Sequence, residues 1–327
     1  MGYAMAANIR RNMAPSATLF VYDVYRPSCE RFVAEFGTAR DCKVKMVDSP
    51  KEAASHAQVI VSIIPTAANV REVYLDETNG VLAAPRLESR LILECSTIDA
   101  ATARDVGGRL AAEGAGTYVD TPVSGGVPAA EAGTLSFLIG HAKPENQEQD
   151  QNQDQHQHQN QNLQPSHTPP ARRIEATVSM MGAPNKIFWC GKLGAGLACK
   201  ISNNYISCTV LLVVAEAMAI GVKSGVDPKL LYEVIHHSTG QTFMGDHVSP
   251  VPGVVAHAPS SNGWRLGFKT QMMTKDIGLG IEVAKELGIE PNMANAALDV
   301  WKAAAQDSRC IDRDGSSVWL RIVEDHE

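Results

Sequence analysis

Short β-rich runs alternate with helical stretches from the start of the chain to Cys190, and this alternation constrains the fold more than any other feature. Strands are predicted at Thr18–Asp23, Lys43–Val47, Gln58–Ile64, Arg90–Cys95, Thr117–Asp120, Leu135–Ile139 and Lys186–Cys190. Helices are predicted at Tyr3–Asn12, Pro27–Phe36, Pro50–His56, Ala68–Tyr74 and Ala100–Ala112, the last with Asp99 as its N-cap. Such alternation predicts an α/β fold with a doubly wound parallel sheet, whose ligands lie beyond the carboxyl ends of the strands.

After Cys190 the pattern becomes all-helical. Gly196 to about Gly225 reads as one continuous helix, about 45 Å long at 1.5 Å per residue. Further helices are predicted near Pro228–His237, Lys269–Leu287, Pro291–Ala305 and Ser316–Val323. With 327 residues the chain is long enough for two domains. We therefore expect an α/β domain at 1–193 and an all-α domain at 194–327.

Residues 143–170 interrupt the first domain with Gln, Asn, Asp, His and Pro and almost nothing to bury. This composition predicts a disordered surface insertion, with a helix beginning again near Ala171. His156 and His158 within it could bind a metal weakly, but a solvated loop is the better interpretation. We predict no metal site elsewhere, because the adjacent His236 and His237 lack further ligands at metal-binding spacing.

The bulk properties exclude several classes of partner. The net charge is −7 and no basic stripe is visible, which argues against nucleic acid. The longest apolar run lies between Asn204 and Glu216, too short to span a membrane. The seven cysteines form no CxxC pair and indicate reduced thiols, with Cys199 and Cys208 as predicted core positions.

The first helix carries part of a dinucleotide-binding pattern. That pattern needs a strand, G-x-G-x-x-G and a helix, but only Gly2 precedes the helix Tyr3–Asn12. Asp23 follows about 20 residues later, at the end of the next strand, where a carboxylate binds the ribose 2′-hydroxyl. Asp23 favours NAD over NADP because it would repel a 2′-phosphate, and Arg26 weakens that preference slightly.

The segment Gly194–Asn204 opens the long helix with one cation and two amides in its first turns. Lys200 and Asn204 are four residues apart, so they share a helix face. A lysine and a carboxamide facing one substrate could move a proton and hold a hydroxyl. A lysine is protonated at neutral pH, but burial and the charge of Lys275 would both lower the pKa of Lys200.

These segments resemble the β-hydroxyacid dehydrogenase family, and within it the 3-hydroxyisobutyrate dehydrogenase branch. Met1–Ile9 resembles the end of the family's G-L-G-x-M-G-x-x-M-A-x-N-L signature, and Gly194–Asn204 its G-x-G-x-x-x-K-x-x-N-N motif. Three further motifs agree in order: Glu94–Asp99, the D-T-P-V-S-G-G run of 120–126, and Lys275–Leu279. The branch is indicated by Pro250–Val254, and the resemblance covers the chain apart from the insertion.

The resemblance implies a Rossmann-type NAD-binding domain followed by a helical domain for substrate binding and dimerisation. It implies NAD-dependent oxidation of 3-hydroxyisobutyrate to methylmalonate semialdehyde in valine degradation. The implied catalytic residues are Lys200 as general acid/base, Asn204 and Ser124. Substrate would be held by Ser124, Gly125, Gly126 and Asn204, and cofactor by Gly2, Asp23, Ile64, Pro65, Asn69, Thr97 and Lys275. The expected partners are a small 3-hydroxy acid and further copies of the chain, as a dimer or tetramer.

The chain departs from the family at its start, where the first strand and first two glycines are missing. A missed exon in the gene model explains this better than a truncated protein that binds NAD poorly, because the other motifs are intact. The family implies a mitochondrial protein, although we see no presequence, and a cytoplasmic one otherwise. Two alternatives stay open: a semialdehyde or glyoxylate-type reductase of the same family, and an inactive relative acting through its Gln-rich loop.

Overall fold

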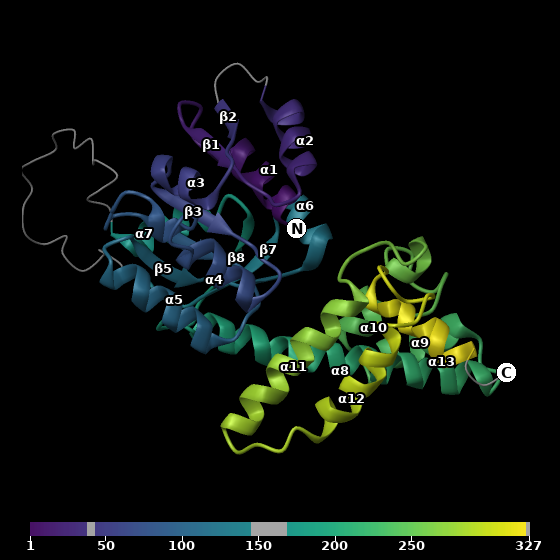
Figure 1. Ribbon diagram of the computed structural model, residues 1–327. Helices are drawn as coiled ribbons and strands as arrows, with labels where there is room; N and C mark the ends of the chain where they lie inside the picture. Colours follow the sequence, from purple (N-terminus) through teal and green to yellow (C-terminus); the bar gives the residue numbers. More distant parts are fainter. Residues whose placement is uncertain (38–42, 145–168, 325–327) are drawn as a thin grey trace, which may run out of the picture. The chain divides into compact units, whose positions relative to one another are not determined.

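The computed structural model describes residues 1–37, 43–144 and 169–324. The chain divides into two compact units, Met1–Lys200 and Ile201–Glu327 (Figure 1). This division falls inside the long helix α8 (Ala195–Lys223), shortly after the boundary predicted at 193/194, which stays a prediction. Most of the predicted insertion, with His156 and His158, lies outside the described residues.

The first unit has the predicted strand–helix alternation. Its elements are α1 (Gly2–Asn12), β1 (Thr18–Val21), α2 (Arg26–Phe36), β2 (Lys43–Met46), α3 (Pro50–His56), β3 (Val59–Ser62), α4 (Ala67–Leu75), a 3-10 turn (Val81–Ala83), β4 (Leu91–Glu94), α5 (Ala100–Ala112), β5 (Thr117–Asp120), β6 (Val123–Ser124), α6 (Gly126–Ala132), β7 (Leu135–Ile139), α7 (Pro170–Val178) and β8 (Gly182–Trp189). The helices α3, α4 and α5 start at side-chain caps: Ser49, Thr66 and Asp99 each accept a backbone N–H of the first turn. The sequence missed β6 and α6, because a two-residue strand and a turn at Gly125 have no periodic pattern.

The strands form three small sheets. β1 pairs with β2, and β3, β4 and β5 pair in that order, all in parallel. β6 is antiparallel to β7, which is parallel to β8. The α/β fold predicted from sequence is confirmed, but the sheet is interrupted between β1 and β3.

The interruption leaves β1 and β3 as edge strands, which are less buried than the central strand β4. β4 has a partner on each side, and all four of its residues are buried. Among the described strands β1 pairs only with β2 and β3 only with β4, and every residue of both is half-buried. In the doubly wound order 3-2-1-4-5-6 the strand before α1 would stand between these two edges. Both edges are therefore open where that order has a neighbouring strand.

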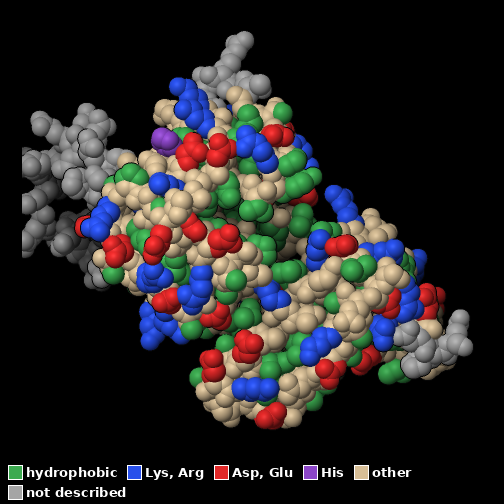
Figure 2. Space-filling view, viewed as in Figure 1, with side chains coloured by type: hydrophobic (Ala, Val, Ile, Leu, Met, Phe, Trp, Pro, Cys, Tyr) green, Lys and Arg blue, Asp and Glu red, His purple; other side chains and the backbone are tan. Residues whose placement is uncertain are grey.

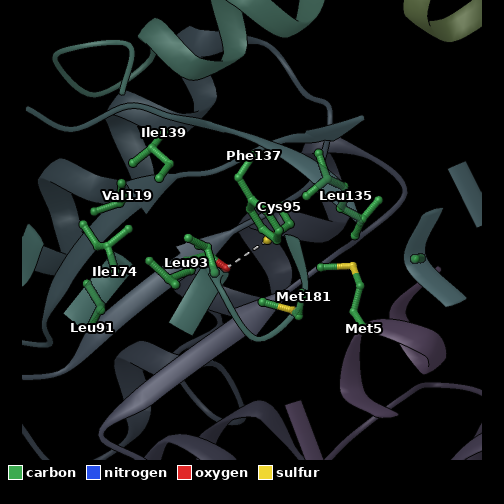
Figure 3. Packing of buried hydrophobic residues seen from close by; sticks show 13 residues of the cluster. Met5, Leu91, Leu93, Cys95, Val119, Leu135, Phe137, Ile139, Ile174 and Met181 are labelled. Carbon is green, nitrogen blue, oxygen red and sulfur yellow. Dashed lines mark hydrogen bonds between the residues drawn. The ribbon is translucent and has the colours of Figure 1, made fainter. Parts of the chain in front are cut away.

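One of the two hydrophobic clusters of the first unit lies on one face of these strands. Figure 3 shows Leu91 and Leu93 of β4 packed with Phe137 of β7, Ile174 of α7 and Met5 of α1. Cys95 is fully inside this cluster, where burial raises the pKa of its thiol to about 12. Met5 joins α1 to the same core, so the first helix is fixed against the sheet by apolar contact.

The second unit is helical, as predicted. It contains most of α8 and then α9 (Pro228–His236), α10 (Phe243–His247), a 3-10 turn (Pro259–Asn262), α11 (Thr270–Glu286), α12 (Asn292–Ala304), a 3-10 turn (Gly315–Ser317) and α13 (Val318–Glu324). Its core surrounds the fully buried Trp301, whose Nε1 donates to the carbonyl of Cys208 at 3.2 Å. Gly280 lets α11 approach α8 closely, because a Cβ there would lie 2.9 Å from Cδ2 of Tyr205.

The helix α8 is apolar on more than one face. By length and composition alone it could cross a membrane, contrary to the sequence interpretation, but part of it packs in the cores. Leu197, Ile201 and Cys208 are buried at helical spacing. Cys199 was wrongly predicted as a core position: it is exposed, because it lies about 200° around the helix from Leu197. On the face shown in Figure 2, acidic and basic side chains are interspersed.

Candidate active site

The predicted cofactor residues of the first unit follow the carboxyl ends of its parallel strands. Asp23 comes after β1, Ile64 and Pro65 after β3, and Thr97 after β4. These are the positions where doubly wound sheets bind ligands. The structure thus places them at the edge where the sequence analysis expected a ligand.

Asp23 lines a cavity of about 200 Å³ between the ends of β1 and β2. Its lining residues are Tyr22, Asp23, Val24, Arg26, Cys29, Met46, Val47 and Asp48. The Asp23 carboxylate is oriented by the backbone N–H of Tyr25, which donates to Oδ1 at 2.8 Å. A held carboxylate in a small cavity at this edge fits the ribose 2′-hydroxyl of a dinucleotide.

Gly2 begins α1 beside the loop after β3. A Cβ at Gly2 would lie 3.0 Å from Cγ2 of Ile63, so the close approach favours glycine. The first turn of α1 has no acidic residue and no side-chain cap, so its N–H groups suit a diphosphate. The residues present therefore fit NAD at its adenosine end and at this helix start.

The loops after β3 and β4 are joined by buried hydrogen bonds. Ser96 Oγ accepts the backbone N–H of Ile64 at 2.5 Å, and the Glu94 carboxylate accepts the N–H of Ser96 at 2.9 Å and the hydroxyl of Ser62. Burial raises the pKa of Glu94, and the hydrogen bonds to Ser62 and Ser96 act in the opposite direction. This network joins the loop of Ile64 to the loop of Ser96, next to the predicted cofactor residues Pro65 and Thr97.

Asn69 lies in the first turn of α4, where it completes a cap. Thr66 Oγ1 accepts the backbone N–H of Asn69 at 3.2 Å, and its hydroxyl donates to Asn69 Oδ1 at 2.7 Å. Part of the hydrogen-bonding capacity of Asn69 is thus used in the helix start. The predicted contact with cofactor stays a prediction.

Asp120 anchors the start of α8. It ends β5 and is completely buried, and its carboxylate accepts the N–H of Gly194 at 2.7 Å and of Leu197 at 2.8 Å. Groups of this kind at a helix start have no carbonyl partner in the helix, and a carboxylate there also complements the helix dipole. Burial raises the pKa of Asp120, while these two hydrogen bonds lower it. The contact fixes the turns that lead to Lys200.

Two glycines make this anchor possible. Gly194 has a φ of +92°, which residues with a Cβ rarely adopt. A Cβ at Gly196 would lie 2.1 Å from the carbonyl oxygen of Leu138 and 3.0 Å from Oδ2 of Asp120. The two glycines of the G-x-G run are therefore required by the close contact of α8 with β5 and β7.

Ser124, Gly125 and Gly126 form a turn between β6 and α6. Ser124 is half-buried, and the two glycines have φ values of +126° and +67°. A Cβ at Gly125 would also lie 2.5 Å from the Cβ of Ala129. The turn exposes backbone beside a hydroxyl, a combination suited to a carboxylate.

Lys200 and Asn204 are both buried, at 8% and 5% exposure, and lie one turn apart on α8. Asn204 Nδ2 donates to Asp276 Oδ2 at 2.6 Å, and Asn203 Nδ2 donates to Asn204 Oδ1 at 3.3 Å. Lys275 Nζ lies 3.0 Å from Asp276 Oδ1. The amide of Asn204 is thus held in one orientation by an almost fully buried carboxylate on α11.

Two carboxylates have roles that the sequence does not predict. Asp120 and Asp276 both lie inside recognised motifs, yet neither is expected from the sequence to hold another site residue. For Asp276 a signal exists in the helical spacing. Asp276 occupies one of the α11 positions that pack into the core, and burying an unpaired carboxylate there would destabilise the fold. For Asp120 there is no local signal, because its partners are more than 70 residues away in sequence.

A larger cavity lies elsewhere. It has about 380 Å³ and is lined by residues near the C-terminus of α5, among them Arg109 and Glu113, with none of the predicted site residues. In the ranges that the structure describes, no group of three or more His, Cys, Asp or Glu side chains could hold a metal ion.

Family models match both parts of the chain. Residues 1–151 match the model described as NAD binding domain of 6-phosphogluconate dehydrogenase. Residues 194–320 match the model described as NAD-binding of NADP-dependent 3-hydroxyisobutyrate dehydrogenase.

Individual relatives agree with these matches. The chain is 32% identical to human mitochondrial 3-hydroxyisobutyrate dehydrogenase over 87% of its length and 73% of that protein. It is 31% identical to an NAD-dependent L-serine dehydrogenase of Pseudomonas aeruginosa, over 92% of this chain and 88% of the other. The structure of 3-hydroxyisobutyrate dehydrogenase of Mycobacterium tuberculosis with L-serine superposes with a TM-score of 0.76 at 29% identity, covering 98% of this chain and 95% of that one.

Proposed function

The chain belongs to the family of NAD-dependent 3-hydroxyisobutyrate dehydrogenases, oxidoreductases acting on CH–OH groups, and on this premise we propose that it oxidises 3-hydroxyisobutyrate to methylmalonate semialdehyde. In metabolism this is a step of valine degradation. The observation that carries the proposal is the buried pair Lys200 and Asn204, one turn apart on α8, with Asn204 held by Asp276.

In this proposal Lys200 moves the proton. The neutral amine of Lys200 accepts the hydroxyl proton of the substrate during oxidation, and the ammonium returns it during reduction. Bound NAD supplies the hydride acceptor. The amide of Asn204 orients the substrate hydroxyl, since Asp276 and Asn203 fix which way its oxygen and nitrogen point.

We assign the remaining roles, in substrate and cofactor binding, by residue type. Ser124 with the backbone of Gly125 and Gly126 binds the substrate carboxylate, because the turn combines a hydroxyl with exposed backbone. Cofactor is held by residues at the carboxyl ends of the strands and on α1, α4 and α11: Gly2, Asp23, Ile64, Pro65, Asn69, Thr97 and Lys275. The ion pair with Asp276 keeps the Lys275 amine near the buried part of α11.

L-serine is a second candidate substrate, because one relative is named for it and one solved relative contains it. Like 3-hydroxyisobutyrate it is a 3-hydroxy acid, with an amino group in place of the methyl group. Reduction of glyoxylate or of a semialdehyde is a third candidate function, and an inactive relative is a fourth. Substrate choice depends on groups that contact the second carbon, so kinetics must separate these candidates.

The test is steady-state kinetics with NAD⁺ on 3-hydroxyisobutyrate and L-serine and, in the reverse direction, with NADH on glyoxylate. We expect the highest kcat/KM for 3-hydroxyisobutyrate. Lys200→Ala should lower kcat by about 10²–10⁴, the usual contribution of a general acid or base. Lys192→Ala is the matched control, because Lys192 is an exposed lysine just before the same helix. A higher kcat/KM on L-serine or glyoxylate would reassign the substrate, and equal turnover by both variants would remove Lys200 from the reaction.

We further propose that the protein is a mitochondrial homo-oligomer built on α8. Ile206, Val213 and Ile220 recur every seven residues on this helix and are 62%, 56% and 69% exposed, which suits packing against the same row of a second copy. Val213→Glu should halve the molar mass in sedimentation equilibrium, whereas Glu216→Gln should not. A monomeric wild type would refute the assembly. Cell fractionation with a mitochondrial matrix marker tests the compartment.

A further inference from the structure

Arg26 is placed where a positive charge is unfavourable on its own. It is the first residue of α2, and helix N-termini favour anions. Two carboxylates compensate: Arg26 Nη1 lies 2.6 Å from Asp48 Oδ1, and Arg26 Nε lies 3.4 Å from Glu30 Oε1. The hydrogen bond to Asp48 is the largest of the influences that raise the pKa of Arg26. The guanidinium is thus engaged on two of its nitrogens.

This contact lies at the Asp23 cavity. Asp48 follows β2 just as Asp23 follows β1, and both carboxylates line the 200 Å³ space together with Arg26. Arg26 is the one basic residue among the described residues that line it. A nucleotide whose ribose lies against Asp23 would therefore bring its 2′ position near two carboxylates and one arginine.

The chemistry of the 2′ position decides what these groups select. A 2′-hydroxyl donates a hydrogen bond to a carboxylate such as Asp23. A 2′-phosphate carries up to two negative charges and needs an arginine fork to offset the nearby acids. With Asp48 and Glu30 on its nitrogens, Arg26 cannot offer both arms of that fork without breaking an ion pair.

We propose that Asp48 is a specificity-determining residue that selects NAD over NADP by holding Arg26. Asp23 repels a 2′-phosphate directly, and Asp48 withholds the side chain that could compensate for that repulsion. The pair is exposed, at 58% and 76% for the two side chains, so its role is selection and not stability. This inference concerns only the adenosine end of the site, and it does not depend on the identity of the substrate.

The test measures binding without turnover. 5′-AMP and 2′,5′-ADP are titrated into the full-length protein by calorimetry, because they differ only in the 2′-phosphate. Wild type should bind 5′-AMP more tightly. Asp48→Asn should raise the affinity for 2′,5′-ADP about tenfold and change the affinity for 5′-AMP by less than twofold. The gain should shrink as salt rises, because exposed charges are screened.

Two variants separate release of Arg26 from loss of one negative charge. Glu30→Gln removes the longer of the two contacts of Arg26, at a position that does not line the cavity, and should tighten 2′,5′-ADP binding clearly less than Asp48→Asn does. Asp48→Asn combined with Arg26→Ala should lose the gain. A gain that persists without Arg26, an equal gain in Glu30→Gln, or no gain in Asp48→Asn would overturn the proposal. Absence of 5′-AMP binding to wild type would overturn the placement of the adenosine end.

Discussion

The predicted site residues at the carboxyl ends of the strands lie in two regions that are held in opposite ways. In the β4–β5 region the strands are almost entirely buried, and the carboxylates of Glu94 and Asp120, at 1% and 0% exposure, bind backbone N–H groups. In the β1–β2 region β1 is half-buried, and an exposed carboxylate, Asp48, holds an exposed arginine. The first region has its geometry fixed by buried bonds, whereas the second selects by charge at little structural cost.

The substitution with the largest expected effect on this difference is Phe32→Ala. Phe32 is one of two buried side chains of α2 and packs edge-on against Tyr3, with ring centroids 5.1 Å apart. Loss of the ring should lower the free energy of unfolding by about 4 kcal/mol, the usual effect of removing a buried aromatic ring. Hydrogen exchange should accelerate in peptides covering β1 and α2 and not in those covering β4. Phe243→Ala, at a 66% exposed phenylalanine, is the control; equal acceleration in β4 would show that the two regions open together.

Gly196→Ala tests the buried region itself. The new Cβ would lie 2.1 Å from a backbone oxygen, so the start of α8 must move away from β7. We expect a loss of about 3 kcal/mol in the free energy of unfolding, at the upper end for overpacking. Gly108→Ala, at a helical glycine with open space around it, should instead stabilise by up to about 1 kcal/mol. Urea unfolding measures the free energy of unfolding of both variants. Equal values for the two variants would mean that the clash at Gly196 is relieved without cost.

Glu94→Gln has a smaller, pH-dependent effect. Burial raises the pKa of Glu94 above its ordinary 4.5, so the folded state binds the proton more tightly than the unfolded state. The stability of the wild type should therefore fall, relative to the variant, as pH rises from about 4.5 through the folded pKa, and then level off. Urea unfolding between pH 4 and 8 measures the difference. A stability of the wild type that rises with pH relative to Glu94→Gln would contradict a raised pKa of Glu94.

Local sequence patterns are sufficient to predict the helices and strands and to propose many of the site residues. They are not sufficient to predict the long-range contacts that hold those residues. The long helix is predicted from Gly196 to about Gly225 and runs from Ala195 to Lys223, because its apolar period and opening glycines are local signals. Whether Lys200 and Asn204 are buried together does not follow from the sequence alone. The orientation of Asn204 depends on Asp276, 72 residues away, and such contacts appear only when the chain is folded.

The same limit explains the sheet. β8 begins at Gly182 and not at the predicted Lys186, because its first residues gain strand geometry from pairing with Leu135 of β7. The half burial of β1 and β3 also follows from pairing, because each strand has a partner on one side only among the described strands.

The open edges of β1 and β3 have a consequence for hydrogen bonding. Thr18–Val21 and Val59–Ser62 are short, apolar segments that pair on one side only among the described strands. On the other side, their backbone N–H and C=O groups are a template for a further strand. A strand that docked between these two edges would supply main-chain partners to both, and would bury the side chains of β1 and β3 as those of β4 are buried now.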